Sequence, residues 1–222
     1  MSGRASGALG VVLAGGSGTR LGGPKAALEL AGRPLIDYLL AAFRQAGVEA
    51  VVVAKRTTSL PELGVPIWRE PERPSHPLCG IVAALRRSKR KAIVVVGCDM
   101  PFVSATLLAA LAAQDAALVV PRQGGRLQPL TARYDRVHLD ALEAALAQER
   151  PLHSVVAALE PVVLDEEALR RFGDPAVLFL NVNTPSDLAE AERHVARVRG
   201  ASRRSAGAGP GASGTPGPIV ET

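Results

Sequence analysis

The chain alternates short, almost wholly apolar runs with longer stretches in which Ala and Leu recur at helical spacing. The apolar runs cover residues 9–14, 49–54, 92–97 and 117–121. Unbroken apolar runs of this kind are typical of parallel strands that helices cover on both faces. The alternation therefore predicts an α/β fold, a three-layer Rossmann-like arrangement around a mostly parallel sheet.

Turn and capping residues indicate where the first long helices begin and end. Pro34 suits a first helical turn and Gly47 lies just past the last periodic residue, which predicts a helix over 34–45. Ser104 is the expected N-cap of a helix that reaches Gln114.

The region after residue 121 has a different pattern. Gly124-Gly125 separates two extended runs, which predicts a hairpin of 117–122 with 127–134, followed by a helix over 135–147. The mostly parallel sheet would then contain an antiparallel section. Further expected elements are strands at 162–164 and 177–180 and a closing helix at 186–198.

One domain is expected to account for residues 1–199. The chain has 222 residues, of which 47% are apolar, enough to bury a core. From residue 200 onward Gly, Pro, Ala and Ser dominate, and large apolar side chains are almost absent. Because such a segment cannot bury enough surface to offset chain ordering, we expect residues 200–222 to form a disordered tail.

The positive charge is concentrated near the C-terminus. The net charge is +5, and the residues from Arg193 onward contain five arginines and one acid, so the rest of the chain is nearly neutral. Aromatic residues make up 3% of the chain, too few for a surface on which bases stack. We therefore expect no nucleic-acid partner.

Cys79 and Cys98 have no second Cys or His at metal-ligand spacing, so neither a zinc site nor a disulfide framework is predicted. We expect both, and the four histidines, to be packing or surface residues: His76, His138, His153 and His194. No run reaches the length of a membrane span, and the first residues lack the apolar core of a signal peptide. The sequence predicts a cytoplasmic protein without a membrane partner.

A glycine-rich loop follows the first apolar run directly. Residues 15–23 contain five glycines, and Arg20 and Lys25 add two cations. Glycine lets a backbone approach a ligand closely, its amides can form a phosphate nest, and the cations suit a triphosphate. The loop has neither the glycine spacing of a Rossmann fingerprint nor the Gly-Lys-Ser/Thr ending of a P-loop. A mobile βα loop without a ligand is the structural alternative.

Asp99 follows the apolar run 92–97, so it is expected at the carboxyl edge of the sheet, where ligands bind in open α/β folds. A carboxylate there suits a hard divalent ion that bridges phosphates. Capping of the strand end is the alternative role. Asn183 precedes Pro185 and is expected either to bind an ion or phosphate or to form a turn.

The glycine-rich loop with Arg20 and Lys25 resembles the signature loop of nucleotidyltransferases that activate phosphorylated metabolites with a nucleoside triphosphate. Within that superfamily the chain is most similar to the molybdenum cofactor guanylyltransferases, the MobA family. Six motifs carry the resemblance in order: LAGG at 13–16, GRPLIDYLL at 32–40, PLCGI at 77–81, GCDMP at 97–101, QPL at 128–130 and NVNTPSDL at 181–188. The double glycine at 15–16 resembles the guanylyl form, whereas cytidylyltransferases usually have Ala-Ala-Gly there.

The resemblance implies a nucleotidyltransferase fold and transfer of GMP from GTP to Mo-molybdopterin, which gives the guanine dinucleotide cofactor and pyrophosphate. It implies Mg²⁺ as cofactor, and molybdoenzymes or other cofactor-biosynthesis proteins as candidate partners. Two alternatives stay open. One is a related nucleotidyltransferase with another base or acceptor, such as a molybdopterin cytidylyltransferase. The other is a noncatalytic nucleotide-binding module.

The resemblance also assigns roles to individual residues. Arg20 and Lys25 would stabilise charge on the phosphates, and Asp99 would hold Mg²⁺, with Asn183 as a second metal ligand. The nucleotide would be bound by Leu13, Ala14, Gly15, Gly16, Lys25, Glu70 and Asp99, with guanine read by the backbone at 13–15. Residues 128–130 are expected either to line the acceptor pocket or to have only a structural role in a strand.

Several positions depart from the family pattern. Pro24 stands where the family commonly has Asp, His76 where it has Gly, and Cys79 where it has Ala. The family's nucleotide-holding carboxylate is best matched by Glu70, with a gap of one residue. The family's Asn after the second strand has no clean equivalent in residues 53–56.

Overall fold

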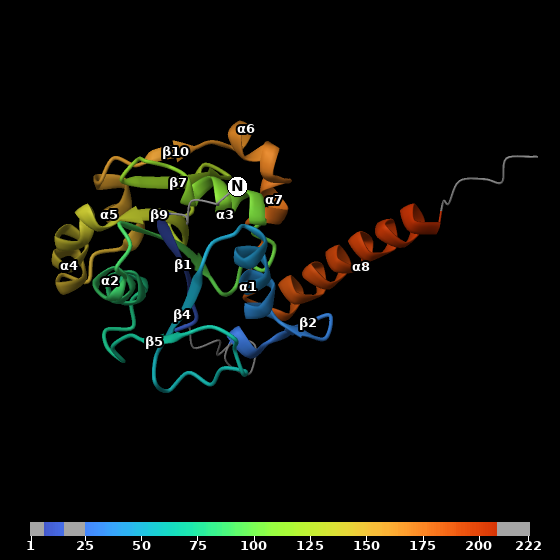
Figure 1. The fold of residues 1–222 in the computed structure, drawn as a ribbon, viewed down its shortest axis with the longest axis horizontal. Helices are drawn as coiled ribbons and strands as arrows, with labels where there is room; N and C mark the ends of the chain where they lie inside the picture. The colour runs from blue at the N-terminus through green and yellow to red at the C-terminus, as the bar shows by residue number, and fades with distance from the viewer. Residues whose placement is uncertain (1–6, 16–24, 208–222) are drawn as a thin grey trace, which may run out of the picture.

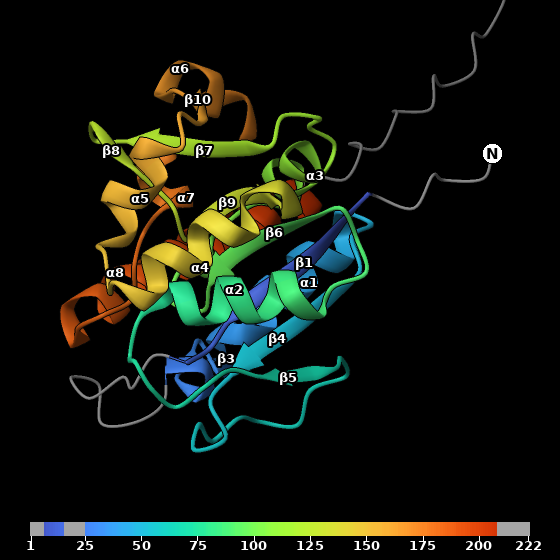
Figure 2. The ribbon, with the colours of Figure 1, turned by 90° about the vertical axis from the view of Figure 1, so that its left-hand side faces the viewer.

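The structure, a computed structural model, describes residues 7–15 and 25–207, with the main chain alone for Lys25 and residues 201–207. Its centre is an eight-stranded sheet with the order β10-β7-β9-β6-β1-β4-β5, in which β8 pairs with β7 (Figure 2). The strands are β1 (Ala8–Leu13), β4 (Ala50–Ala54), β5 (Ile67–Arg69), β6 (Ala92–Gly97), β7 (Leu118–Gln123), β8 (Arg126–Leu127), β9 (Thr131–Asp135) and β10 (Val162–Leu164).

Strand direction agrees with the sequence prediction. The pairs β6-β1, β1-β4, β4-β5 and β7-β10 are parallel. The strand β9 lies antiparallel between β6 and β7, and β8 is antiparallel to β7. The predicted α/β fold with a mostly parallel sheet and an antiparallel section is therefore confirmed.

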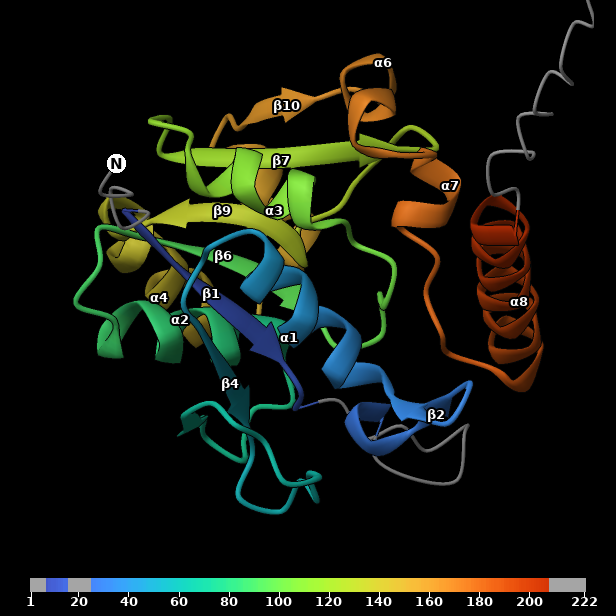
Figure 3. The same cartoon turned by 45° about the vertical axis from the view of Figure 1, so that its right-hand side comes forward.

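Helices cover both faces of this sheet, which makes three layers (Figures 1 and 3). The α-helices are α1 (Leu35–Gln45), α2 (Pro77–Arg87), α3 (Ala105–Ala112), α4 (Leu139–Ala147), α5 (Leu152–Ala158), α6 (Glu166–Leu169), α7 (Pro175–Leu178) and α8 (Pro185–Gly207). The 3₁₀ turns are η2 (Lys25–Ala27), η3 (Arg136–His138) and η4 (Arg170–Phe172), and a small separate hairpin joins β2 (Glu29–Leu30) to β3 (Arg33–Pro34).

Two apolar clusters separate the layers. One lies between the sheet and α1 and α3, and the other lies between the sheet and α2, α4 and α5. Every residue of β6 is buried, as an unbroken apolar run between two helical layers requires. Gly10 in β1 is needed for this packing, because a Cβ atom there would lie 2.7 Å from the ring of Phe43.

Local signals placed several elements correctly. The Oγ atom of Ser104 accepts a hydrogen bond from the Leu107 N–H and caps α3, as expected. Gly124 and Gly125 adopt positive φ angles of 57° and 73° in the turn between β7 and β8, where glycine is favoured. The predicted second hairpin strand is interrupted, however, because residues 128–130 form a turn and only then does β9 begin.

The strand predicted at 177–180 is wrong. The segment is helical in α7, which begins with Asp174 as N-cap and Pro175 in the first turn. These two residues form a helix start signal that outweighs the short β-branched run. The buried side chains of Leu178 and Phe179 complete the cluster under α3.

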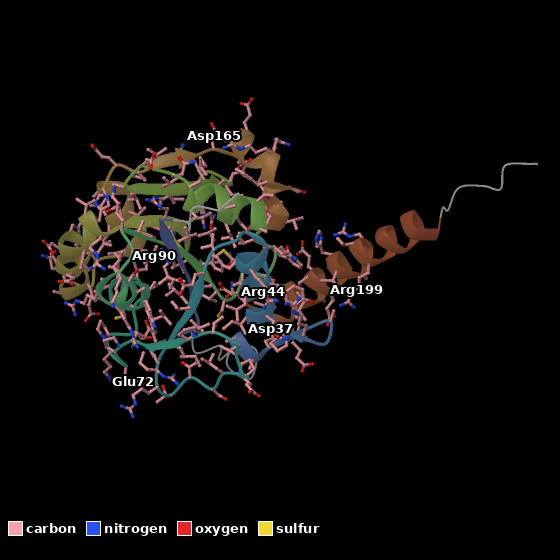
Figure 4. The ribbon with its side chains drawn as sticks, in the orientation of Figure 1. Asp37, Arg44, Glu72, Arg90, Asp165 and Arg199 are labelled. Carbon is pink, nitrogen blue, oxygen red and sulfur yellow. The ribbon has the colours of Figure 1, made fainter. Side chains whose placement is uncertain are left out.

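The closing helix is longer than predicted. Its first turns pack through Leu188, Ala191 and Val195 against β2 and α1, and the rest projects away from the body, where Figure 4 shows Arg199. It continues to Gly207, so residues 200–207 of the expected disordered tail are helical, while 208–222 lie outside the described residues. Within 7–15 and 25–207, no helix combines the length and apolar character needed to cross a membrane.

Candidate functional site

Four neighbouring parallel strands end at one edge of the sheet, in the order β6, β1, β4 and β5. The residues just past these ends are Asp99, Gly15, Lys55 and Glu70. They line one cavity of about 260 Å³, together with His76 at the start of α2. Ligands bind at the carboxyl ends of strands in open α/β sheets, so the position itself indicates a binding site.

The end of β1 is fixed by hydrogen bonds to both neighbours. The Leu13 carbonyl accepts from the Cys98 N–H at 3.0 Å, and the Ala14 N–H donates to the Val53 carbonyl at 2.8 Å. Leu13 and Gly15 line the cavity, whereas Ala14 is buried beneath it. The Ala14 N–H is therefore already paired, and Gly15 presents the loop backbone to the cavity.

Asp99 lies where its position after β6 predicts. It lines the cavity and is half-buried. A Cβ atom on Gly97 would lie 2.8 Å from the Asp99 Oδ1 atom, so the glycine before it leaves room for the carboxylate. The carboxylate can therefore meet a ligand in the cavity without displacing the strand.

Asn183 approaches Asp99 through the main chain. The Val182 N–H donates to the Asp99 carbonyl at 2.8 Å, and the N–H groups of Asn183 and Thr184 both donate to the Asp187 carboxylate, which caps α8. The described residues that line the cavity do not include Asn183. The segments that carry the two candidate metal ligands are thus joined by a backbone hydrogen bond, but the described lining of the cavity includes Asp99 and not Asn183.

The described side chains at this edge of the sheet offer few ligands for a divalent ion. Among the described residues, no group of three Asp, Glu, His or Cys side chains could hold a metal by itself. One carboxylate at the cavity wall, with the Asn183 amide on the adjoining chain segment, fits an ion such as Mg²⁺, which takes one or two protein oxygens and completes its shell with phosphates and water.

Glu70 is the most unusual side chain of the cavity. It is 9% exposed, and its carboxylate makes no hydrogen bond with the part of the chain that is described. Burial raises its pKa to about 7, an effect that the Lys55 ammonium partly opposes. A Cβ atom would lie 1.9 Å from the Glu70 Oε1 atom if built on Gly15, and 2.9 Å from Oε2 if built on Gly80. Two glycines therefore make the space for this carboxylate.

Residues 70–76, here called the strap, form the far wall of the cavity. Lys55 Nζ donates to the Glu72 carbonyl at 3.0 Å and to Ser75 Oγ at 3.3 Å. The Glu72 carboxylate accepts from Thr57 Oγ1 and from the N–H groups of Arg56 and Thr57, and the Thr57 hydroxyl is the main cause of its lowered pKa. Glu72 points away from the core at the β5 side (Figure 4). The strap is thus tied to the residues that follow β4.

His76 ends the strap and caps α2. Its Nδ1 atom accepts a hydrogen bond from the Leu78 N–H at 3.1 Å, and its half-buried ring lines the cavity. The sequence suggested only a packing or surface role for this histidine. Lys55 was missed as well. Neither carries a motif, and the one sequence signal was that His76 replaces a glycine of the resembled family.

The structure describes only some of the other predicted site residues. Arg20 and Gly16 lie outside the described residues, and Lys25 is described by its main chain in η2 alone. Gln128, Pro129 and Leu130 form a turn rather than the predicted strand, and Leu130 lines the cavity. Both cysteines are buried and form no disulfide, as expected.

Comparison with known proteins gives consistent matches. Residues 10–162 match the family described as MobA-like NTP transferase domain. The chain is 34% identical over 190 residues to a probable molybdenum cofactor guanylyltransferase of Pelotomaculum thermopropionicum, covering 83% of this chain and 91% of that protein. It is also 34% identical over 190 residues to the molybdenum cofactor guanylyltransferase of Cereibacter sphaeroides, covering 82% and 94%.

Solved structures resemble the fold over most of its length. The molybdopterin-guanine dinucleotide biosynthesis protein A of Archaeoglobus fulgidus superposes with a TM-score of 0.71 at 28% identity, covering 85% of this chain and 98% of that one. The 2-C-methyl-D-erythritol 4-phosphate cytidylyltransferase of Thermus thermophilus superposes with a TM-score of 0.62 at 22% identity, covering 86% and 99%. The second likeness concerns the fold alone.

Proposed function

Because the chain belongs to the family of MobA-like NTP transferases, we propose that it is a molybdenum cofactor guanylyltransferase. It transfers GMP from GTP to the terminal phosphate of Mo-molybdopterin and releases pyrophosphate. Relatives that are similar to this chain over most of its length carry names that support this reaction. The observation that carries it is the single cavity at the carboxyl edge of the sheet, which brings Asp99, Gly15 and Glu70 together.

The reaction needs positioning and charge stabilisation more than proton transfer. A phosphate oxygen of the acceptor attacks the α-phosphorus of GTP in line, a bond to the acceptor forms, and the bond to pyrophosphate breaks. Because the acceptor phosphate is already anionic at neutral pH, no general base is required. The chain therefore acts by aligning two phosphates and neutralising their charge.

The family typically needs a divalent metal, and we propose Mg²⁺ with Asp99 as its protein ligand and Asn183 beside it. Such an ion would supply positive charge that offsets the charge of the phosphates. Arg20 and Lys25 are proposed to add charge on the side of the departing pyrophosphate, and the amides of Gly15 and Gly16 to cradle the phosphates. Asp99 would hold this ion at the cavity wall.

The part of the cavity lined by Lys55, Glu70 and His76, here called the base end, favours guanine as the bound base. A Cβ atom at position 15 would collide with the Glu70 carboxylate, so glycine at this position and the buried carboxylate occur together for a steric reason. We propose that Glu70 holds the nucleotide, beside the backbone of Leu13, Ala14 and Gly15. A carboxylate is an acceptor, which suits the N–H groups of guanine.

Other parts of the proposal rest on sequence. Contacts with molybdoenzymes or other cofactor-biosynthesis proteins, a cytoplasmic location and a domain limit near residue 199 remain predictions. So does the absence of a nucleic-acid partner.

Pyrophosphate release tests the proposal. The full-length protein is given each of the four nucleoside triphosphates, with Mg²⁺, in the presence and absence of molybdopterin. We expect release with GTP and only when the acceptor is present. Release with CTP instead would favour the cytidylyl alternative, and no release with any pair would favour a noncatalytic nucleotide-binding module.

A further inference from the structure

Two polar side chains of the cavity, Glu70 and His76, have hydrogen-bonding capacity that the described residues do not use. Glu70 is 9% exposed as a whole residue, and its carboxylate lines the cavity without a hydrogen bond to the described residues. The His76 ring lines the same cavity and makes one hydrogen bond within residues 7–15 and 25–207, through Nδ1. No fully buried side-chain polar atom of the described residues lacks a partner, so the Glu70 oxygens face the cavity, where a ligand can reach them.

The one hydrogen bond of His76 fixes its tautomer. Nδ1 accepts from the Leu78 N–H, so this nitrogen carries no proton. In a neutral imidazole the proton then lies on Nε2, which makes Nε2 a donor. The cavity therefore offers a carboxylate acceptor and an imidazole N–H donor.

This pair of opposite groups suits a base that presents an acceptor beside a donor, as guanine and uracil do, and guanine alone adds a second donor, N2–H₂. Guanine presents an acceptor at O6 beside the donors N1–H and N2–H₂. Adenine presents a donor, the N6 amine, where guanine has O6, and cytosine likewise presents its N4 amine. A donor that faces an amine is left unpaired, and an unpaired buried polar group is a strong basis for discrimination.

We propose that His76 is a specificity-determining residue of guanylyl transfer: its Nε2–H donates to O6 of guanine while the Glu70 carboxylate accepts from N1–H and N2–H₂. This inference rests on the proposed function, whose GTP preference it explains. Lys55 is less suited to read the base, because its ammonium already donates twice to the strap. Lys55 instead holds in place the segment that carries both reading groups.

The test separates two roles of His76: donation from Nε2 to the base and capping of α2 by Nδ1. In His76→Asn the side chain still caps α2, because Asn is among the best N-cap residues, but it is too short to replace Nε2. Affinities for GTP and for 6-thio-GTP are measured by calorimetry for both proteins. The thio analogue keeps N1–H and N2–H₂ and replaces O6 by sulfur, a weak acceptor.

We expect His76→Asn to weaken GTP binding about tenfold, the scale of one hydrogen bond to a buried group. Binding of 6-thio-GTP should change less than threefold, and the melting temperature should stay the same. The matched control is His153→Asn at an exposed histidine of α5, which should change neither affinity. If His76→Asn lowers the melting temperature, His76→Gly replaces it, since glycine is a tolerated N-cap without a donor.

Two outcomes would overturn the inference. One is unchanged GTP binding in a folded variant, and the other is equal weakening of both nucleotides, which would mean that His76 acts on the shape of the strap. Failure of the proposed function looks different. In that case the wild-type protein itself shows no preference for GTP over CTP.

Discussion

The two ends of the cavity differ in how they are built. At the end proposed to bind the phosphates, Asp99 and the glycine-rich loop come just after the central strands β6 and β1, and each lies in a short consecutive motif. At the base end, Lys55, Glu70 and His76 come from three segments that hydrogen bonds join. The phosphate end thus depends on local sequence, and the base end on tertiary packing. Substitutions at the two ends should therefore have different kinetic effects.

The largest effect is expected at the phosphate end, from Asp99→Ala. The carboxylate lines the cavity and contributes little packing, so the variant should fold while the metal loses its protein ligand. We expect turnover to fall by about three orders of magnitude or more, the scale of losing a central electrostatic stabiliser. Activity and thermal unfolding are measured on the same preparation. Normal turnover with Mg²⁺ would make Asp99 a structural residue.

Lys25→Ala should follow, with turnover slowed by about two to three orders of magnitude. Negative charge shifts toward pyrophosphate as the bond breaks, so a cation there acts more on the transition state than on bound GTP. Steady-state kinetics separates the two cases. A change in the Michaelis constant alone would assign Lys25 to ground-state binding, and no change in either constant would remove the glycine-rich loop from the triphosphate site.

Gly15→Ala tests the point where the two ends meet, because Gly15 begins the glycine-rich loop and lies against Glu70. The added Cβ would lie 1.9 Å from the Glu70 Oε1 atom, so the carboxylate must leave its place. We expect GTP affinity to fall by about ten- to thirtyfold, as for the loss of a hydrogen-bonded charged group. The control is Gly7→Ala, where an added Cβ meets no atom within 4 Å. Equal affinities of Gly15→Ala and wild type would separate Glu70 from nucleotide binding.

The protonation state of Glu70 gives a pH test of the base end. Burial raises the pKa of Glu70 to about 7 in the free protein. The Lys55 ammonium lowers this pKa and the Glu72 carboxylate raises it, and His76 and Cys79 also lie nearby. Only the ionised carboxylate accepts from both N–H groups of guanine. GTP affinity should therefore fall as the pH drops below about 7, by up to tenfold per pH unit. In Glu70→Gln this dependence should disappear.

The ionisation of Glu70 should affect stability in the opposite direction: as the pH rises, GTP affinity increases but the free energy of unfolding decreases. A carboxyl whose pKa is raised on folding binds more protons in the folded state, so stability declines as the pH rises from 4.5 to about 7. Glu70→Gln should then stabilise the free protein at pH 8 by roughly 2 kcal/mol, less than the full shift implies because the carboxylate keeps some solvent contact. Unfolding in urea at pH 4 and pH 8 measures this. Equal stability of the two proteins at pH 8 would contradict the buried carboxylate.

The smallest effect is expected from Lys55→Met, which keeps the apolar stem and removes the two hydrogen bonds to the strap. Because these bonds are exposed, GTP affinity should fall only about threefold. Calorimetry against the Arg56→Met control, which leaves the Arg56 backbone bond to Glu72 in place, isolates the ammonium. A loss as large as that of Gly15→Ala would make Lys55 a direct ligand of the nucleotide.

The sequence predicts the fold better than the site. The apolar runs identified β1, β4, β6 and β7, because strands covered on both faces leave an unmistakable pattern. The pattern failed at β5, which has only three residues at the sheet edge, and at α7, where a capping Asp-Pro pair outweighs the β-branched residues. Asp99 was predictable because it directly follows an apolar strand.

The base end was less predictable for a physical reason. Glu70 was found by resemblance, with a gap, and nothing in its neighbourhood along the chain shows that Gly15 and Gly80 make its space. The tautomer of His76 depends on a backbone N–H two residues away that is free only because a helix begins there. Such contacts exist only once β4, the strap and α2 have packed.

The most direct test of the account is a comparative titration of GTP and CTP on the wild-type protein at pH 8, where Glu70 is ionised. The donor and acceptor arrangement of the base end requires GTP to bind at least about tenfold more tightly, the scale of one buried hydrogen bond in discrimination. Equal or tighter binding of CTP would contradict the guanine site while leaving the fold intact.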